Sequence, residues 1–247
     1  MSIESVAALA VMIFAAAWLY SMAGHAGASG YLAAMAIFSL EPEVMKPTAL
    51  VLNILVASIA TMKFSRAGYF SWETLWPFAV TSIPMAFIGG RIRLEDSSYK
   101  IIVGAVLIYS AVRLLFNPRQ VASEDAKRPQ WWVALPTGAA LGFLSGLVGV
   151  GGGIFLSPLL LLLKWEETRK AAGVAAAFIL VNSIAGLLGH LASVRLLPAA
   201  IPWWLLAAGT GGWIGAELGS RKLDPLLIRR VLAVVVLIAG IKLLLTS

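Results

Sequence analysis

The 247-residue chain contains no cysteine, and only 13% of its residues are charged. Without cysteine the chain has no disulfide bond, no thiolate metal site and no thiol nucleophile. The low charge and the 60% hydrophobic content exclude a soluble globular protein, since soluble domains are about a quarter charged and about half apolar. They also exclude a disordered chain, which needs low hydrophobicity and high charge. The composition therefore predicts an integral membrane protein.

The apolar residues fall in ten runs that short charged stretches separate. The runs lie at 4–23, 27–40, 46–64, 72–90, 98–116, 132–147, 151–163, 170–191, 198–218 and 226–246. Eight of them approach the roughly 20 residues that cross a bilayer. The second and the seventh are too short to cross alone, because at about 1.5 Å per residue they reach roughly 20 Å into a core about 30 Å thick. We expect an all-α polytopic membrane protein. Its first run should stay as a membrane helix, because Met1–Glu4 lacks the positive charge of a signal peptide.

The ten runs form two sets of five with the same layout. Ile54–Ala60 matches Ile179–Ala185 at six of seven positions, and the short run is the second of each set. Glycines beside the short runs also correspond, with Gly24, Gly27 and Gly30 opposite Gly146, Gly149 and Gly152. Chance similarity between apolar helices is the alternative explanation. We expect two tandem transmembrane repeats, at 1–116 and 132–247, joined by a polar linker at 117–131.

The relative orientation of the repeats depends on the short runs. If each short run is re-entrant, a repeat crosses four times and the repeats are parallel; if it completes a crossing, five crossings invert the second repeat. Basic residues follow the fourth run of both repeats, which favours parallel repeats by the positive-inside rule, although the basic linker then lies on the wrong side. The net charge of +7 is therefore an orientation signal and does not indicate nucleic-acid binding.

Five glycines lie within residues 146–153 and should break the helix that begins at 132. Each glycine costs a helix about 1 kcal/mol relative to alanine. Unwound backbone within a membrane must line a cavity or be buried in protein. The short helix that follows would present N–H donors and a positive dipole end, which suit an anion. Broken helices at matching positions of two repeats indicate a transporter's central site, and close helix packing through glycine is the alternative.

The glycine-rich stretch also carries a resemblance to a known family. It reads Gly149-Val150-Gly151-Gly152-Gly153-Ile154-Phe155-Leu156-Ser157-Pro158-Leu159. With the duplicated layout and the chain length, it resembles the TauE/SafE family of membrane transporters, also called the sulfite exporter or toluene sulfonate uptake permease family. The resemblance implies transport of a sulfur-containing anion such as sulfite, sulfoacetate or a related organosulfonate. The first half departs from this pattern, with Ala36 opposite Pro158 and a different sequence at 24–31.

The predicted substrate-binding residues surround the two glycine breaks. They are His25, Gly27, Ser29, Gly30, Asn53, Ser58, Gly149, Gly151, Gly152, Gly153, Ser157, Asn182 and Ser183. The small polar groups among them should face the bundle interior, as intramembrane polar residues do. Plain interhelical hydrogen bonding is the alternative for each, as capping of the short helix is for Ser29.

Three ionisable residues in apolar surroundings are candidates for coupling transport to H+ or Na+: His25, His190 and Glu217. His25 is suited to donate to an oxyanion or to carry a proton, because the histidine pKa is about 6.5. A structural histidine bonded to a carbonyl is the alternative. We expect no metal site, no cofactor and no catalytic residue.

Other functions remain as alternatives. Gly27-Ala28-Ser29-Gly30 fits the GxSG pattern of rhomboid intramembrane proteases, with His25 or His190 as base, but the ten-run layout and the glycines at 149–153 then have no explanation. An anion channel would use the same breaks to line a pore, and a scaffold would bind no anion. The chain has no GxxxxGK[ST] motif, so direct ATP drive is not expected. We expect a multi-pass secondary carrier in the lipid bilayer of the cell inner (plasma) membrane that moves a small anion by alternating access; a homo-oligomer is compatible but not required.

Overall fold

The computed structural model describes residues 2–92, 95–115, 129–190 and 197–221, with residues 237, 240, 241, 244 and 245 near the C-terminus. These residues form α-helices and connections and contain no β-strand. The helices are α1 (Ile3–Ser21), α2 (Ala28–Ile37), α3 (Pro42–Arg66), α4 (Trp72–Arg91), α5 (Asp96–Leu115), α6 (Trp131–Val148), α7 (Gly153–Leu162), α8 (Thr168–Gly189) and α9 (Ile201–Arg221). Most of the predicted linker and of the predicted run at 226–246 lies outside the described residues.

Four of the described helices are long and apolar enough to cross a membrane: α1, α3, α6 and α8. The sequence predicts more spans, but α4 and α9 carry prolines and tryptophans, and α9 also several glycines, which lower their mean hydropathy. Helices α2 and α7 contain 10 residues each and are too short to cross alone. The protein is therefore an all-α membrane protein.

Large apolar side chains are exposed on the outer faces of the helices. Val11, Val80, Ile88, Leu206 and Ile214 are each at least 44% exposed. An apolar surface of this extent is not compatible with water around a soluble monomer. The hydrocarbon core of a bilayer is the environment in which these faces are stable.

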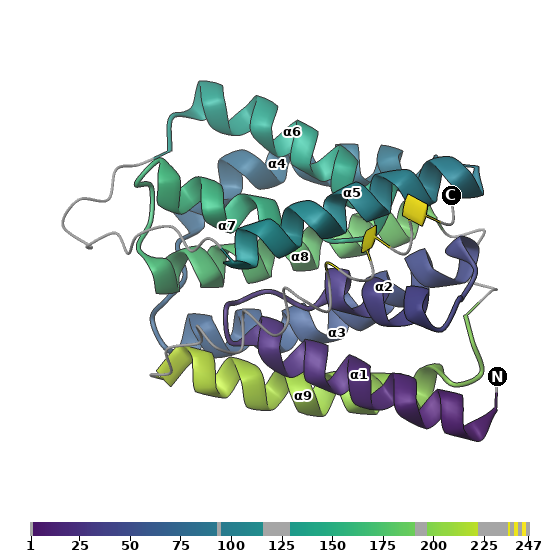
Figure 1. The fold of residues 1–247 in the computed structure, drawn as a ribbon. Helices are drawn as coiled ribbons and strands as arrows, with labels where there is room; N and C mark the ends of the chain where they lie inside the picture. Colours follow the sequence, from purple (N-terminus) through teal and green to yellow (C-terminus); the bar gives the residue numbers. More distant parts are fainter. Residues whose placement is uncertain are drawn as a thin grey trace.

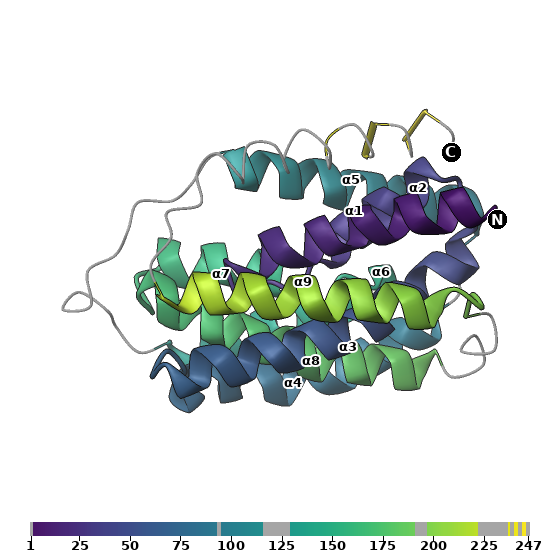
Figure 2. The ribbon, with the colours of Figure 1, turned by 90° about the horizontal axis from the view of Figure 1, so that it is seen from below.

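The long helices pack in three neighbouring pairs (Figure 1): α1 beside α9, α4 beside α6, and α3 beside α8 between them. Contacts also join α4 to α8 and α9 to α3, so the central pair touches both outer pairs. Figure 2 shows that α5 lies along the side of the bundle opposite α3 and α4. The short helices lie inside this frame, with α2 packed on α1 and α3, and α7 packed on α8.

Two rows of glycine bring the outer pairs into backbone contact. Gly138, Gly142 and Gly146 of α6 face the carbonyl oxygens of Phe78, Ser82 and Ala86 of α4, and Gly211, Gly215 and Gly219 of α9 face those of Phe14, Trp18 and Met22 of α1. A Cβ atom at any of these glycines would overlap the opposite carbonyl oxygen. Such seams of small residues allow membrane helices to approach closely. Since the residue numbers rise together on both sides of each seam, the two helices of each outer pair run parallel.

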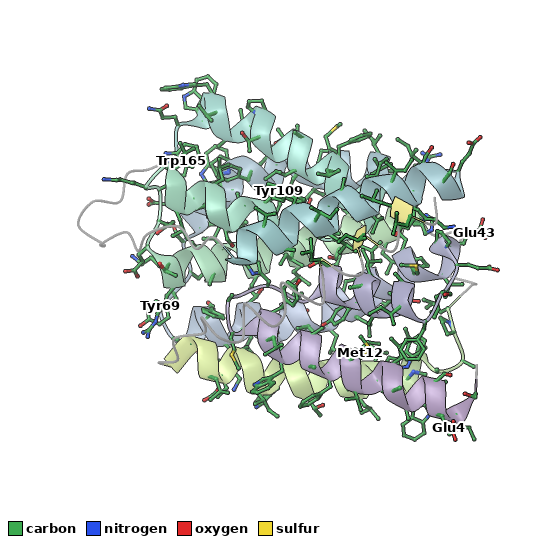
Figure 3. All side chains as sticks on the ribbon, in the orientation of Figure 1. Glu4, Met12, Glu43, Tyr69, Tyr109 and Trp165 are labelled. Atoms are coloured by element: carbon green, nitrogen blue, oxygen red, sulfur yellow. The ribbon has the colours of Figure 1, made fainter. Side chains whose placement is uncertain are left out.

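The central helices α3 and α8 run antiparallel. Asn53 in the middle of α3 contacts Ser183, whereas Gly173 near the start of α8 faces Phe64 near the end of α3. Figure 3 shows the same directions: Glu43 at the start of α3 lies at one end of the molecule, and Tyr69, just beyond α3, lies at the other end with Trp165, which precedes α8.

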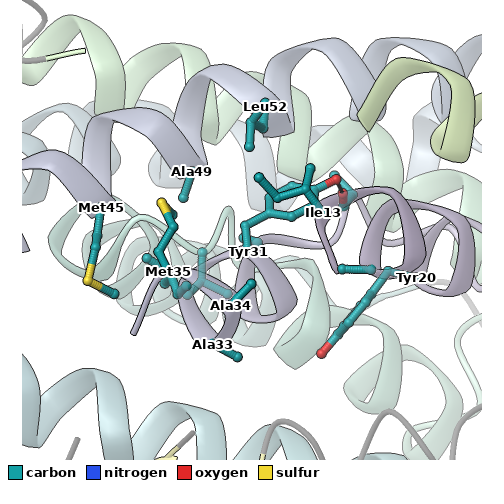
Figure 4. Close-up of a cluster of buried hydrophobic side chains, with 14 of the residues drawn as sticks. Ile13, Tyr20, Tyr31, Ala33, Ala34, Met35, Met45, Ala49 and Leu52 are labelled. Atoms are coloured by element: carbon teal, nitrogen blue, oxygen red, sulfur yellow. Dashed lines mark hydrogen bonds between the residues drawn. The ribbon is translucent and has the colours of Figure 1, made fainter. Parts of the chain in front are cut away.

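Helix α2 is buried at the centre of the bundle. All of its residues except Ile37 are buried, and Tyr31 and Met35 pack among Ile13, Ala49 and Leu52 (Figure 4). A helix that is apolar on every side is stable only when it is enclosed. The break that precedes α2 is therefore enclosed by protein, as unwound backbone at membrane depth must be.

Candidate functional site

Two glycine breaks interrupt the helices at the centre of the fold. The first separates α1 from α2 and contains Gly24 and Gly27, with φ of 71° and 100°; the second separates α6 from α7 and contains Gly149, with φ of 85°, and Gly151 and Gly152, each with φ of 79°. Residues other than glycine rarely adopt these angles. Gly27 and Gly152 are the N-cap residues of α2 and α7, and Gly149 is the C-cap of α6. The glycine-rich sequences thus allow the chain to turn back and start a new short helix.

The two breaks share one backbone pattern. Gly24 and Gly149 correspond, as do Gly27 and Gly152, and each is followed by a helix of 10 residues. Ser39 and Lys164, with positive φ of 56° and 55°, then end the two short helices at the same separation along the chain. This register agrees with the match of Ile54–Ala60 to Ile179–Ala185, and it differs by three residues from the predicted pairing of the glycines. The reason is Gly146, which lies inside α6 and serves the contact with Ala86 rather than the break.

The start of each short helix presents backbone donors. In α7 the amides of Phe155 and Leu156 donate to the Gly152 carbonyl at 3.1 and 3.2 Å, which leaves those of Gly153 and Ile154 without an intrahelical acceptor. In α2 the Tyr31 amide donates to the Gly27 carbonyl at 2.9 Å. The three amides before it likewise have no intrahelical acceptor. Neither N-cap has a side chain that could satisfy these donors. Two helix N-termini, each suited to an anion, are thus enclosed in the bundle.

A side-chain contact joins the first break to α7. His25 Nε2 lies 3.0 Å from the Ser157 hydroxyl oxygen. The Tyr20 ring packs edge-on against the His25 imidazole, and the Tyr20 hydroxyl accepts a hydrogen bond of 2.7 Å from Ser29. Ser29 therefore bonds to α1 and does not cap α2. The structure brings His25, Ser29 and Ser157 into one polar cluster.

A second polar cluster lies where α3 and α8 cross beside the α6–α7 break. The Asn53 amide nitrogen donates to the Val150 carbonyl and to the Ser183 hydroxyl, both at 3.4 Å. Gly151 lies directly against Asn53 and Ser183, where a Cβ atom would approach both within 3.1 Å. Asn182 donates to the Phe178 carbonyl of its own helix at 2.8 Å.

Three atoms in this region are polar, buried and without a hydrogen-bond partner among the described residues: Asn53 Oδ1, Asn182 Oδ1 and Ser145 Oγ. Each such atom costs about 1–3 kcal/mol when it stays unpaired. Ser145 lies beside Gly152, whose Cβ would be 3.4 Å from that of Ser145. Native proteins retain such groups mainly where a ligand, an ion or water completes them. The region around the second break is therefore suited to bind a small polar molecule.

The model of the family described as "Sulfite exporter TauE/SafE" matches residues 9–243. The chain belongs to this family. The matched range includes both glycine breaks and every polar residue of the two clusters. The TauE/SafE family is one of membrane transporters and not of enzymes, in agreement with the geometry of the GxSG sequence, whose Ser29 donates to Tyr20 and not to an imidazole.

Curated relatives cover nearly the whole TauE/SafE chain. The probable membrane transporter protein y4hK of Sinorhizobium fredii is 40% identical over 239 residues, which is 96% of this chain and 97% of the relative. The probable membrane transporter proteins YjnA and YunE of Bacillus subtilis are 25% and 22% identical and cover 92% and 83% of this chain and 94% and 82% of their own lengths. No solved structure gives a significant match.

Some predicted residues lie outside the two polar clusters. Ser58 is exposed and donates to the Ile54 carbonyl of its own helix at 2.6 Å, so it faces away from α8. Glu217 on α9 accepts a 2.6 Å salt bridge from Lys63, near the end of α3. Gly30 lies within α2 against Ala16 and Tyr20, where it serves packing.

The predictions also omit residues that the fold brings to the second break. Tyr99 on α5 donates to the Val148 carbonyl at 3.2 Å. Lys46 on α3 lies beside Gly149, and its Nζ donates to the Gly90 carbonyl at 3.3 Å. His190, which was predicted as a coupling candidate, has its Nδ1 3.1 Å from that same carbonyl. The available signal was a lysine at the first position of the apolar run at 46–64, which is easily taken for the end of a connection.

Proposed function

We propose that this TauE/SafE transporter is a secondary carrier that holds a small sulfur-containing anion between the two glycine breaks. The observation that carries the proposal is the pair of helix N-termini enclosed in the bundle, with uncapped amide donors at α2 and α7 and a link between the breaks through His25 and Ser157. The family description names sulfite, and sulfoacetate and related organosulfonates are the other candidates.

The chemistry of a sulfonate or sulfite group supports this assignment. Its oxygens accept hydrogen bonds and carry negative charge, so it needs several donors when it leaves water. The break regions supply backbone N–H groups and the hydroxyls of Ser145, Ser157 and Ser183 in buried positions. Backbone N–H groups do not titrate, so they bind an anion without gaining or losing a proton. Such donors suit a ligand that must be both bound and released.

The proposal includes two inverted repeats, 1–116 and 132–247, with residues 117–131 between them. Three observations support the relation: the shared φ pattern of the breaks, the antiparallel central pair α3 and α8, and the pairing of α4 with α6 and of α9 with α1. In this scheme α2 and α7 count as crossings, so five segments invert the second repeat. The positive-inside preference for parallel repeats is thus outweighed by the helix directions. Broken helices in inverted repeats suit alternating access around a site at mid-membrane.

Coupling to H+ or Na+ is proposed for His25 before His190 and Glu217. His25 lies in the first break against Ser157, whereas Glu217 is held by Lys63 away from both breaks. The inner (plasma) membrane is the proposed location. The predictions of a homo-oligomer and of a coupling ion stay predictions.

The test is anion binding followed by counterflow. The detergent-purified protein is screened by thermal shift against sulfite, sulfoacetate, taurine, thiosulfate and sulfate, and we expect stabilisation by one or more of the sulfur oxyanions. In proteoliposomes, trapped unlabelled substrate should then accelerate uptake of labelled substrate. Large passive flux without counterflow would make the protein a channel, and no stabilisation by any of these anions would overturn the proposal.

A further inference from the structure

Lys46 is a buried cation in the interior of a membrane protein. It lies near the start of α3, and the residue is 4% exposed. Lysine and arginine within membrane segments are costly unless paired, and they mark binding sites or pathways. The proposed anion site between the two breaks does not include Lys46. The buried position of this cation therefore needs another explanation.

The described residues give Lys46 no carboxylate partner. Lys63, at the other end of α3, has such a partner in Glu217. The single hydrogen bond of Lys46 goes to the Gly90 carbonyl, at a long 3.3 Å. An ammonium group has three N–H donors and a full positive charge, so one carbonyl satisfies only part of its demand.

A capping role explains where the ammonium lies but does not neutralise it. Gly90 belongs to the last turn of α4, where carbonyls lack intrahelical donors and a cation is favourable. His190 already serves that purpose: a carbonyl only accepts, so the imidazole donates to Gly90 through Nδ1 at 3.1 Å. The hydrogen bond from His190 already caps the Gly90 carbonyl, so the second hydrogen bond from Lys46 is not needed for capping.

The position of Lys46 connects it to the second break. A Cβ atom on Gly149 would lie 3.1 Å from Lys46 Cγ, so the lysine stem runs along the start of the break. Along α3, Lys46 lies seven residues before Asn53, about 10 Å at 1.5 Å per residue. The ammonium is therefore outside the Asn53–Ser183 cluster, toward the end of the molecule where α3 begins and α8 ends.

We propose that Lys46, with His190 beside it, forms a second station for the substrate anion, between the α6–α7 break and that end of the molecule. The station binds a small oxyanion through the Lys46 ammonium and favours a dianion over a monoanion, because the interaction is between full charges. This proposal rests on the proposed function only for the identity of the anion.

At the equivalent position of the second half, the described residues contain no lysine. In the register given by Ile54–Ala60 and Ile179–Ala185, the position of Lys46 on α3 corresponds to Ala171 on α8, which is buried and apolar. In this proposal the buried position at this point carries a positive charge on one side of the carrier and an apolar side chain on the other. A cation on one route raises the local concentration of the anion on that side.

The test compares Lys46→Gln and Lys46→Arg with a charge-matched control, Arg66→Gln, which removes an exposed cation from the same helix. Sulfate is the dianion probe and methanesulfonate the monoanion probe, with Kd obtained from anion-dependent thermal shifts. Lys46→Gln should weaken sulfate binding about tenfold or more, the effect of losing a charge-assisted hydrogen bond, and methanesulfonate binding less. Lys46→Arg and Arg66→Gln should keep the wild-type values.

A second experiment uses the absence of cysteine from the chain. Lys46→Cys provides a single thiol, and an aminoethyl thiosulfonate reagent restores a positive charge there whereas a methyl thiosulfonate does not. We expect the charged adduct alone to recover sulfate binding. This comparison does not use Lys46→Gln, so it remains a test if that variant does not fold. Unchanged sulfate affinity in Lys46→Gln, or equal recovery by both reagents, would overturn the station and leave the carrier intact. No anion binding by the wild-type protein would overturn the carrier itself.

Discussion

The His25 imidazole lies 3.0 Å from the Ser157 hydroxyl, although the two residues are 132 positions apart in the chain. The contact ties the first glycine break to the short helix that follows the second break. An anion bound between the two helix starts would meet both side chains, and we expect the pair to couple the two breaks energetically.

The His25–Ser157 contact predicts energetic coupling in anion binding. His25→Ala and Ser157→Ala should each weaken binding about two- to tenfold, the worth of one hydrogen bond. The double variant should lose less than the sum of the two losses, because both single changes remove the same contact. Thermal-shift titration of the four proteins measures the cycle, with Ser58→Ala, exposed and bonded to its own helix, as the unchanged control. Strictly additive losses would contradict the coupling.

Asn53→Asp should weaken anion binding at least about tenfold, and it should also lower stability because a buried carboxylate oxygen then faces the Val150 carbonyl. The substitution keeps the shape of the side chain but places a carboxylate beside the α6–α7 break, where Asn53 now contacts Val150 and Ser183. A negative charge there repels the anion. Repulsion between close like charges should weaken binding about tenfold or more. Equilibrium binding at neutral pH checks the result, and Asn53→Ser, which retains a donor, should bind. Wild-type affinity in Asn53→Asp would place the anion elsewhere.

Gly211→Ala should destabilise the protein strongly, and Gly209→Ala on the same helix should not. A Cβ atom on Gly211 meets the backbone carbonyl of Phe14, which cannot move aside, whereas one on Gly209 meets the flexible end of Leu55 at 3.2 Å. We expect a loss of about 1–3 kcal/mol or more at Gly211 from overpacking. Thermal unfolding in detergent compares the pair, and equal melting temperatures would mean that the α1–α9 seam is looser than described.

Glu217→Gln should lower thermal stability but leave anion binding unchanged. The variant leaves Lys63 without its carboxylate, and Lys63 keeps its position over the Trp213 ring at 3.7 Å. Removing both charges in Lys63→Met with Glu217→Gln should recover part of the stability, since Lys63 is then no longer a charge without its carboxylate. Melting temperatures and Kd of the two variants provide the measurement. A loss of anion binding in Glu217→Gln would show that this pair belongs to the site.

The sequence predicts the helices and the breaks because both depend on residues that are neighbours in the chain. The apolar runs end within a few residues of the described helices, and the glycines at 149–153 mark the break without any knowledge of packing. The family follows from the same stretch. These features are local, so composition and spacing are sufficient to find them.

Contacts between helices were beyond the sequence, because they depend on the rotation and direction of each helix. Ser58 has the same residue type as Ser183, but its hydroxyl bonds within α3 and faces outward. Gly146 looks like a break residue and is a packing residue. Lys46 was missed because a lysine at the edge of an apolar run is usually a connection, and only the fold places α4 and α8 over it.

The glycine seams have a mechanical consequence for transport. Each seam joins a helix of the first half of the chain to a helix of the second half, α4 to α6 and α1 to α9, through backbone contacts that leave no side chains to repack. The two halves of the sequence are thus interlocked, and we expect that they do not move as separate rigid bodies. Glycine contacts of the same kind join α4 to α8, where Gly90 faces the Gly186 carbonyl and Gly189 faces that of Phe87, so we expect α4, α6 and α8 to move as one unit.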